Sequence, residues 1–298
     1  MEMNLSLGPL LYYWSRDDVL AFYAEAPRWP IARVYLGETV CSRRHLLRLS
    51  DWLELAEKLS DTGKEVVLSS QTLIESESDL KTLRRIVGDG RFRVEANEWG
   101  AVRLLSEAGV PFVAGPTLNV YNHETLAVLA GLGAQRWLPP VELSRATLAS
   151  LLERAPAGIE TEVFAYGRLP LAYSARCFTA RHYNLPKDDC QFRCLDYPDG
   201  LPLSTREGAP FLTLNGIQTQ SAGVYNLIGE RTALRELGIA SLRLSPQSRH
   251  MGRVVEAFHA ALAGEQIPAD LTRLMPGAAV DGYWHGRAGL EHSMEKHA

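Results

Sequence analysis

Three of the four cysteines of the chain lie close together. Cys177, Cys190 and Cys194 occupy one polar segment, with twelve and then three residues between them. A cysteine that serves only as a small buried hydrophobic residue usually sits in an apolar run, whereas these three lie among Arg, Lys, Asp, Asn and Pro residues. A C-x-x-x-C pair brings two thiolates within reach of one metal centre, and the longer gap lets the third fold back. We interpret this segment as a metal-binding loop.

The residue types leave three kinds of site open. Four thiolates can hold a tetrahedral zinc ion or an iron–sulfur cluster. Zinc sites commonly contain short C-x-x-C pairs, and their absence here favours a cluster. Two disulfide bonds are the third option, which the lack of a secretory signal in this sequence disfavours. The basic neighbours Arg176, Arg181, Lys187 and Arg193 are expected to favour the thiolate form of the cysteines.

The fourth cysteine, Cys41, lies far upstream, shortly after the apolar run at residues 31–36. One interpretation is a lone cysteine at the end of a strand. The other makes it the fourth ligand, because a residue that follows a barrel strand can lie on the same rim as a later loop.

Composition and charge restrict the class of protein. The chain of 298 residues is 46% hydrophobic and 22% charged, which is ordinary for a globular protein with an extensive core. A formal net charge of −4 argues against a sequence-independent nucleic-acid binder. The sequence shows no signal peptide and no apolar run long enough for a membrane helix, so we expect a cytoplasmic protein without a membrane span.

Strand-like and helix-like stretches alternate along the chain, which predicts βαβ units and a parallel sheet. We expect strands at residues 4–7, 31–36, 65–69, 91–95, 111–114, 136–138, 160–165 and 240–244. We expect helices at residues 16–24, 50–60, 76–87, 98–108, 122–130, 144–153, 231–237 and 248–262. Ser50, Asn122 and Ser144 stand where N-caps belong.

Eight strands with intervening helices predict a single (β/α)8 TIM-barrel-like domain over residues 1–298. The alternation breaks after the seventh strand, at about 167–237, where the cysteine loop lies. A break of this length in a compact domain is usually functional, and we expect a cluster-binding insertion on the C-terminal rim. Beyond Leu262 the pattern predicts a loose terminus that contains His285, His292 and His297.

Several familiar catalytic motifs are missing. The sequence contains no nucleotide-binding glycine loop, no Gly-x-Ser-x-Gly elbow and no His-Glu-x-x-His helix. No Ser/His/Asp or Cys/His arrangement can be identified either, so nothing in the sequence favours a hydrolase.

The segment 162–177 resembles the signature of the collagenase-like peptidase family, which reads Glu-x-Phe-x-x-Gly, a small residue, an aliphatic residue, Cys, four residues and Gly-x-Cys. The matching positions are Glu162, Phe164, Gly167, Leu169 and Cys177. The departures are Arg168 for the small residue, Pro170 for the first cysteine and Ala175 for the glycine. Residues 115–122 and 214–216 extend the resemblance over most of the chain.

The loss of a cysteine at Pro170 is similar to the pattern of a branch of this family that acts in oxygen-independent, anaerobic ubiquinone biosynthesis, where an early cysteine replaces the missing one. The resemblance implies a [4Fe-4S] cluster held by Cys41, Cys177, Cys190 and Cys194. It also implies a heterodimer with a sister protein and hydroxylation of the quinone ring without dioxygen. Because no membrane span is expected, work on such a lipid-soluble substrate would need a lipid-carrier protein that presents the precursor, or a peripheral membrane contact. The alternatives are a peptidase and a structural zinc scaffold.

A few other polar residues have two interpretations each. Glu162 can position a ligand or serve as a structural hydrogen-bond acceptor. Asn119 can face a ligand, and Asn122 is a helix cap. Arg176 and Arg193 can bind an anion or tune the cluster by their charge. His182 is a possible acid or base, or a solvated loop residue.

Overall fold

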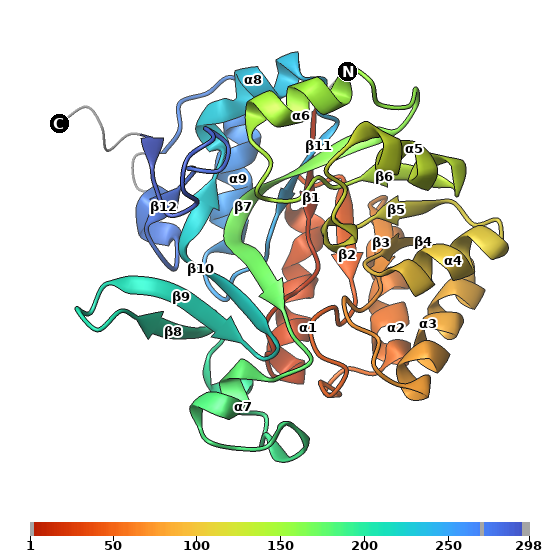
Figure 1. The fold of residues 1–298 in the computed structure, drawn as a ribbon, viewed down its shortest axis with the longest axis vertical. Helices are drawn as coiled ribbons and strands as arrows, with labels where there is room; N and C mark the ends of the chain where they lie inside the picture. The colour runs from red at the N-terminus through yellow and green to blue at the C-terminus, as the bar shows by residue number, and fades with distance from the viewer. Residues whose placement is uncertain (1–2, 269–270, 294–298) are drawn as a thin grey trace.

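Eight parallel strands close into a barrel in this computed structural model, which describes residues 3–268 and 271–293 (Figure 1). The barrel strands are β1 (Asn4–Leu7), β2 (Arg33–Leu36), β3 (Glu65–Ser69), β4 (Arg93–Ala96), β5 (Phe112–Ala114), β6 (Ala134–Trp137), β7 (Glu160–Tyr173) and β11 (Ser241–Leu244). Each pairs with the next in parallel, and β11 closes the ring by pairing with both β7 and β1. The predicted TIM-barrel-like fold is confirmed.

The helices surround the barrel (Figure 1). They are α1 (Arg16–Glu25), α2 (Leu49–Ser60), α3 (Glu77–Asp89), α4 (Trp99–Glu107), α5 (His123–Gly131), α6 (Arg145–Leu152), α8 (Arg231–Glu236) and α9 (Met251–Leu262). The side chains of Asn122 and Ser144 cap α5 and α6 as predicted. The predicted cap at Ser50 is wrong: α2 begins one residue earlier, and the Asp51 carboxylate accepts the backbone N–H of Arg48.

The barrel interior carries charge where such barrels commonly carry branched apolar side chains. Glu162 on β7 has no exposed surface. It accepts hydrogen bonds from Ser6, from Tyr35 (2.5 Å) and from Arg243 Nε (2.9 Å), and Arg243 Nη1 also reaches Glu95 at 2.5 Å. Burial alone would raise the pKa of Glu162, but the Arg243 charge and these hydrogen bonds hold it below its usual range.

A second set of ion pairs lies where the strands begin. Arg136 on β6 is 2% exposed and reaches both Glu65, at the start of β3, and Glu160, at the start of β7. Arg33, at the start of β2, pairs with Glu65 at 2.5 Å. Because these side chains come from four strands, the ion pairs join parts of the barrel that are far apart in sequence.

The insertion begins inside a strand and not in a loop. Strand β7 was expected to end at Ala165 but continues to Tyr173, because its second half pairs antiparallel with β10 (Gln218–Asn226). Strands β9 (Pro210–Asn215) and β8 (Leu201–Ser204) extend this sheet, and helix α7 (Phe178–His182) lies between β7 and β8. In chain order the cysteine segment therefore lies between strands β7 and β8. It is found below the barrel in Figure 1.

The loose terminus expected after Leu262 is wrong for residues 271–293. Strand β12 (Ala279–Val280) pairs with β10, and Trp284 is 2% exposed and donates to Glu230. His285 lies near Glu230 and Asp281. His297 lies outside the described residues.

In the described part of the chain we find no helix with the length and hydropathy needed to cross a membrane.

Candidate functional site

Each of the four cysteines is placed by a different local element. Cys41 follows β2, and the Glu38 carboxylate accepts its backbone N–H at 3.1 Å. Cys177 is the N-cap of α7, where its sulfur accepts the N–H of Ala180 at 3.4 Å. Cys190 and Cys194 lie in two short 3-10 turns that follow α7. All four thiols are free.

The fold brings these thiols into one neighbourhood. Cys41 and Cys177 pack against the same apolar cluster, formed by Leu11, Val40 and Ile217. A negative charge on Cys177 would raise the pKa of both Cys41 and Cys194, and one on Cys190 would raise the pKa of Cys177. Cys177 is therefore within electrostatic reach of each of the other three, although Cys41 is more than a hundred residues away in sequence.

Arg44 is the residue at this site that the sequence analysis missed. It is 4% exposed, and it donates to the Leu11 carbonyl and to Asn215 Oδ1, both at 2.7 Å. Burial raises the pKa of Cys41, Cys177 and Cys194, and the Arg44 guanidinium opposes that rise. No local sequence signal could have singled it out, because its hydrogen-bond partners Leu11 and Asn215 lie in two distant segments.

Burial is the largest influence on the thiols. It raises the pKa of Cys41 to about 11 and also raises the pKa of Cys177 and Cys194, against the opposing effect of Arg44. The flanking cations expected in this role have other partners: Lys187 pairs with Glu75 at 2.5 Å, and Arg193 pairs with Asp196. Arg176 and Arg181 are exposed.

The four cysteines are not arranged around one point. Across residues 3–268 and 271–293, no group of three or more His, Cys, Asp or Glu side chains has the geometry to hold a single metal ion. A cubane cluster has a separate iron for each thiolate, so its ligands need not converge on one point. The ligand role of Cys41, Cys177, Cys190 and Cys194 stays a prediction.

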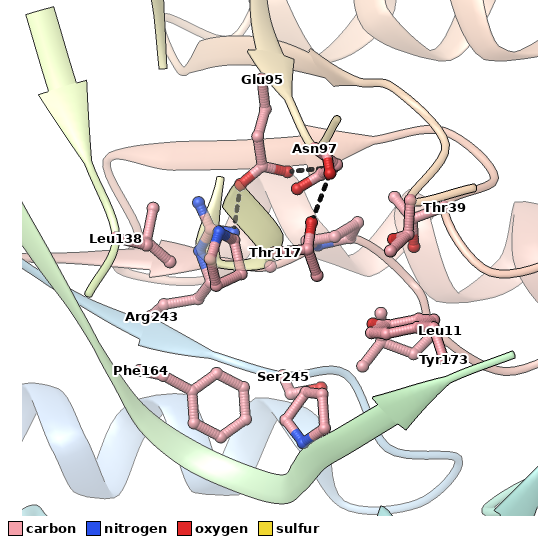
Figure 2. A pocket seen from close by; sticks show the side chains of 15 residues that line it. Leu11, Thr39, Glu95, Asn97, Thr117, Leu138, Phe164, Tyr173, Arg243 and Ser245 are labelled. Carbon is pink, nitrogen blue, oxygen red and sulfur yellow. Dashed lines mark hydrogen bonds and ion pairs between the residues drawn. The ribbon is translucent and has the colours of Figure 1, made fainter. Parts of the chain in front are cut away.

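A cavity of about 40 Å³ lies at the C-terminal ends of the barrel strands. Figure 2 shows Glu95 and Asn97 above it, Phe164 and Ser245 below it, and Arg243 and Thr39 on opposite sides. It adjoins an outer cavity of about 280 Å³. The two share the lining residues Thr72, Pro116, Thr117, Phe164, Pro170 and Tyr173.

The cavity and the thiols are separated by one layer of side chains. Leu11 and Tyr173 line the cavity and also belong to, or pack on, the apolar cluster that Cys41 and Cys177 touch. A chain of hydrogen bonds runs the same way, from Arg44 to Asn215 (2.7 Å), from Asn215 to Gln218 (2.9 Å) and from Gln218 to the Tyr173 hydroxyl (2.6 Å). Burial raises the pKa of Tyr173 to about 12, so its hydroxyl stays protonated at neutral pH.

Comparison with known proteins decides the family. Residues 20–264, most of the chain, match the family model described as peptidase family U32. The chain belongs to peptidase family U32.

Solved structures with a similar fold are distant in sequence. A U32 peptidase, Mk0906, is 12% identical with a TM-score of 0.48, over 83% of this chain and 94% of that one. A tryptophan synthase from Pyrococcus furiosus is 12% identical with a TM-score of 0.47, over 89% of this chain and 100% of that one. A dihydropteroate synthase from Thermus thermophilus is 12% identical with a TM-score of 0.45, over 87% of this chain and 94% of that one.

In this U32 chain, the family signature lies along β7 and the start of the insertion. Glu162 accepts hydrogen bonds from Arg243 and Tyr35 inside the barrel, which favours its interpretation as a structural hydrogen-bond acceptor. Phe164 lines both cavities. Pro170 stands where the family signature has a cysteine, and it also lines both cavities. The position at which this chain lacks the signature cysteine is therefore part of the cavity wall.

The remaining polar candidates divide between the outer cavity and the surface. Asn119 lines the outer cavity, and its backbone is left-handed with a φ of 57°. His182 is exposed, and its ring contacts the Tyr183 ring edge-on. Arg193 stacks on Tyr183 at 5.1 Å from its guanidinium carbon to the ring centroid. None of these three is a main influence on the pKa of Cys41, Cys177 or Cys194.

Proposed function

We propose that this chain holds a [4Fe-4S] cluster through its four cysteines. We propose further that it acts in oxygen-independent ubiquinone biosynthesis like UbiV, the U32 family member in which an early cysteine replaces the one missing from the signature and whose sister protein is UbiU. The observation that carries the proposal is that the chain has only four cysteines and that Cys41, although distant in sequence, packs on the same apolar cluster as Cys177 of the cysteine segment. The early Cys41 and the departure at Pro170 follow the pattern of the UbiV branch.

The donor set fits a cluster because four thiolates are the usual ligands of a cubane. A bound cluster would supply one-electron transfer. The protein's own part is to hold the thiols in place: Glu38 fixes the Cys41 backbone and α7 fixes Cys177. Burial raises the pKa of Cys41 and Cys194, and the buried guanidinium of Arg44, which is also paired with Glu38 at 3.5 Å, partly opposes this rise.

The nearby cavity supports an enzymatic role over a purely structural one. Barrel enzymes place their sites at the C-terminal ends of the strands. Here a cavity lies at that end, and its lining residues Leu11 and Tyr173 also belong to, or pack on, the apolar cluster that Cys41 and Cys177 touch. We propose that the chain is one subunit of a hydroxylase complex with a UbiU-like partner, to which a lipid-carrier protein presents the precursor.

The experiment is anaerobic purification followed by visible absorbance and by iron, sulfide and zinc analysis. The proposal expects about four irons and four sulfides per chain and a broad absorbance that bleaches on reduction. One zinc per chain and no sulfide would instead support the structural zinc scaffold.

The family name raises peptidase activity as a second candidate. We predict none, because no side chain near the cavity is an activated nucleophile: its hydroxyl groups belong to Thr39, Thr72, Thr117, Tyr173 and Ser245, with no histidine among the lining residues. Cleavage of casein by metal-replete, protease-free protein, abolished by Ser245→Ala, would overturn this.

A further inference from the structure

Another cavity lies beside helices α2 and α3, away from the two cavities at the C-terminal ends of the barrel strands (Figure 1). Its volume is about 300 Å³, and among the described residues it shares no lining residue with either of them. The loop that follows β2 and carries Cys41 forms part of its wall, through Glu38, Ser42 and His45. Ligand pockets span about 300–1,000 Å³, so the cavity has room for one small molecule.

Two arginines that line this cavity have no counter-ion. Arg48 is the N-cap residue of α2, and Arg85 lies on α3. In the part of the chain that the structure describes, neither side chain forms an ion pair. Asp51, whose carboxylate accepts the backbone N–H of Arg48, forms its own ion pair with Arg16 at 2.8 Å. Both guanidinium groups are exposed and can therefore bind an anion without breaking an existing ion pair.

The two acidic residues of the lining already have donors of their own. Glu38 accepts the backbone N–H of Val40 at 2.9 Å and of Cys41 at 3.1 Å, and it pairs with Arg44 at 3.5 Å. Asp79 accepts two backbone N–H groups at the start of α3, at 3.1 and 3.2 Å. These contacts satisfy both carboxylates locally and leave the two unpaired guanidinium groups available to a ligand.

The balance of charge and donors in the lining favours phosphate. Its three arginines outnumber its two carboxylates, and His45 adds positive charge when it is protonated. Neutral donors come from Ser42, Gln71, Ser78 and Thr82. A phosphate monoester presents three oxygens that accept hydrogen bonds, and guanidinium groups bind it in a bidentate manner. A carboxylate has only two oxygens and would use fewer of these donors.

The cavity also has an apolar part. It is formed by Leu36, Leu47, Leu49, Trp52, Leu68 and Ile86. An apolar group attached to the phosphate would be removed from water against these side chains, which favours an organic ester over inorganic phosphate.

We propose that this cavity binds a small phosphate monoester, with the phosphate between Arg48 and Arg85 and the organic group against Trp52 and Ile86. Because Arg48 ends the loop that carries Cys41 and Arg85 lies on α3, the bound phosphate would tie that loop to the helix. The site is separate from the cavity at the barrel mouth, and the proposal does not rest on the proposed function.

The test is calorimetry of phenyl phosphate, with benzoate and inorganic phosphate as comparisons, on the anaerobically purified full chain. Phenyl phosphate is expected to bind about tenfold more tightly than either comparison. Arg85→Ala and Arg48→Ala should each weaken its binding about tenfold, the value of one hydrogen bond between charged groups. Both variants should fold, because the two side chains are exposed and form no ion pair.

Arg84→Ala is the matched control. Arg84 is the neighbouring residue on α3, is also exposed, lies outside the cavity lining and pairs with Glu77. Its loss should change the affinity less than about twofold. No binding of phenyl phosphate at millimolar concentration, equal or tighter binding of benzoate, or an equal loss in Arg84→Ala and Arg85→Ala would overturn the inference. Sedimentation of the chain with phosphatidate vesicles, without binding of phenyl phosphate, would overturn it in favour of a lipid surface.

Discussion

At the scale of single residues, the Glu162 carboxylate accepts three hydrogen bonds inside the barrel and balances Arg243. We predict that Glu162→Gln lowers the free energy of unfolding by about 3 kcal/mol at pH 7, because it leaves a buried cation with one counter-charge fewer. Urea denaturation measures the change. The control is Glu54→Gln, which breaks an exposed pair with Lys58 and should cost less than about 0.5 kcal/mol.

The same carboxylate gives the loss a defined pH dependence. The pKa of Glu162 is lowered on folding, so its contribution to stability is complete above its ordinary value of 4.5 and disappears as the pH falls through the lowered value. The difference between wild type and Glu162→Gln should therefore be constant near neutrality and shrink in acid. A difference that grows as the pH falls would contradict this assignment.

Cys41 decides whether the thiol neighbourhood is a ligand set. We predict that Cys41→Ala, made and handled without oxygen, loses as much iron and sulfide as Cys194→Ala, because a cubane needs four thiolates and the chain has no fifth cysteine. Ser42→Ala controls for disturbance of the loop. Full iron content in Cys41→Ala, with loss in Cys194→Ala, would make Cys41 a buried thiol only.

At the scale of elements, Gly167 marks the place where β7 leaves the barrel and joins the insertion. Its φ is 131°, and a Cβ there would lie 2.5 Å from the Ser245 Cβ. We predict that Gly167→Ala lowers the free energy of unfolding by about 2 kcal/mol or more, through backbone strain and this clash. Thermal and urea unfolding measure it.

Gly88→Ala is the matched control for that substitution. Gly88 lies within α3, and no atom comes within 4 Å of an added Cβ. Alanine is a better helix former, so this variant should gain about 0.5–1 kcal/mol. Equal losses in the free energy of unfolding of Gly167→Ala and Gly88→Ala would contradict the strain and clash assigned to Gly167.

The elements were largely predictable because the barrel strands and helices are local patterns. Strands β1 and β3 have the predicted bounds at both ends, and apart from the end of β7 and the start of α9 the other bounds differ by at most two residues. The extension of β7 to Tyr173 was not predictable, because it depends on pairing with β10, some fifty residues later. Arg44 and the cavity were missed for the same reason, since their contacts join segments that are distant in sequence.

At the scale of the whole molecule, the barrel and its insertion place two features side by side. Three of the thiols lie in the insertion and Cys41 lies in the loop after β2, whereas the cavity lies at the mouth of the barrel. Tyr173 of β7 lines the cavity and packs on the apolar cluster that Cys41 and Cys177 touch. Strand β7 is thus the element that joins them. A change in the insertion is expected to reach the cavity through this strand.

The last prediction concerns assembly, which the resemblance to the UbiV branch motivates. We predict a one-to-one heterodimer with a UbiU-like protein, visible as co-purification of an untagged chain with a tagged partner and as a single peak in size-exclusion chromatography. A stable pair of this kind buries about 1,200–2,000 Å² and should survive dilution to micromolar concentration. Cys194→Ala, tested in parallel, separates contact that depends on the metal centre from contact that does not. Separate elution of two well-folded, iron-loaded proteins at micromolar concentration would show that the chain acts without this partner.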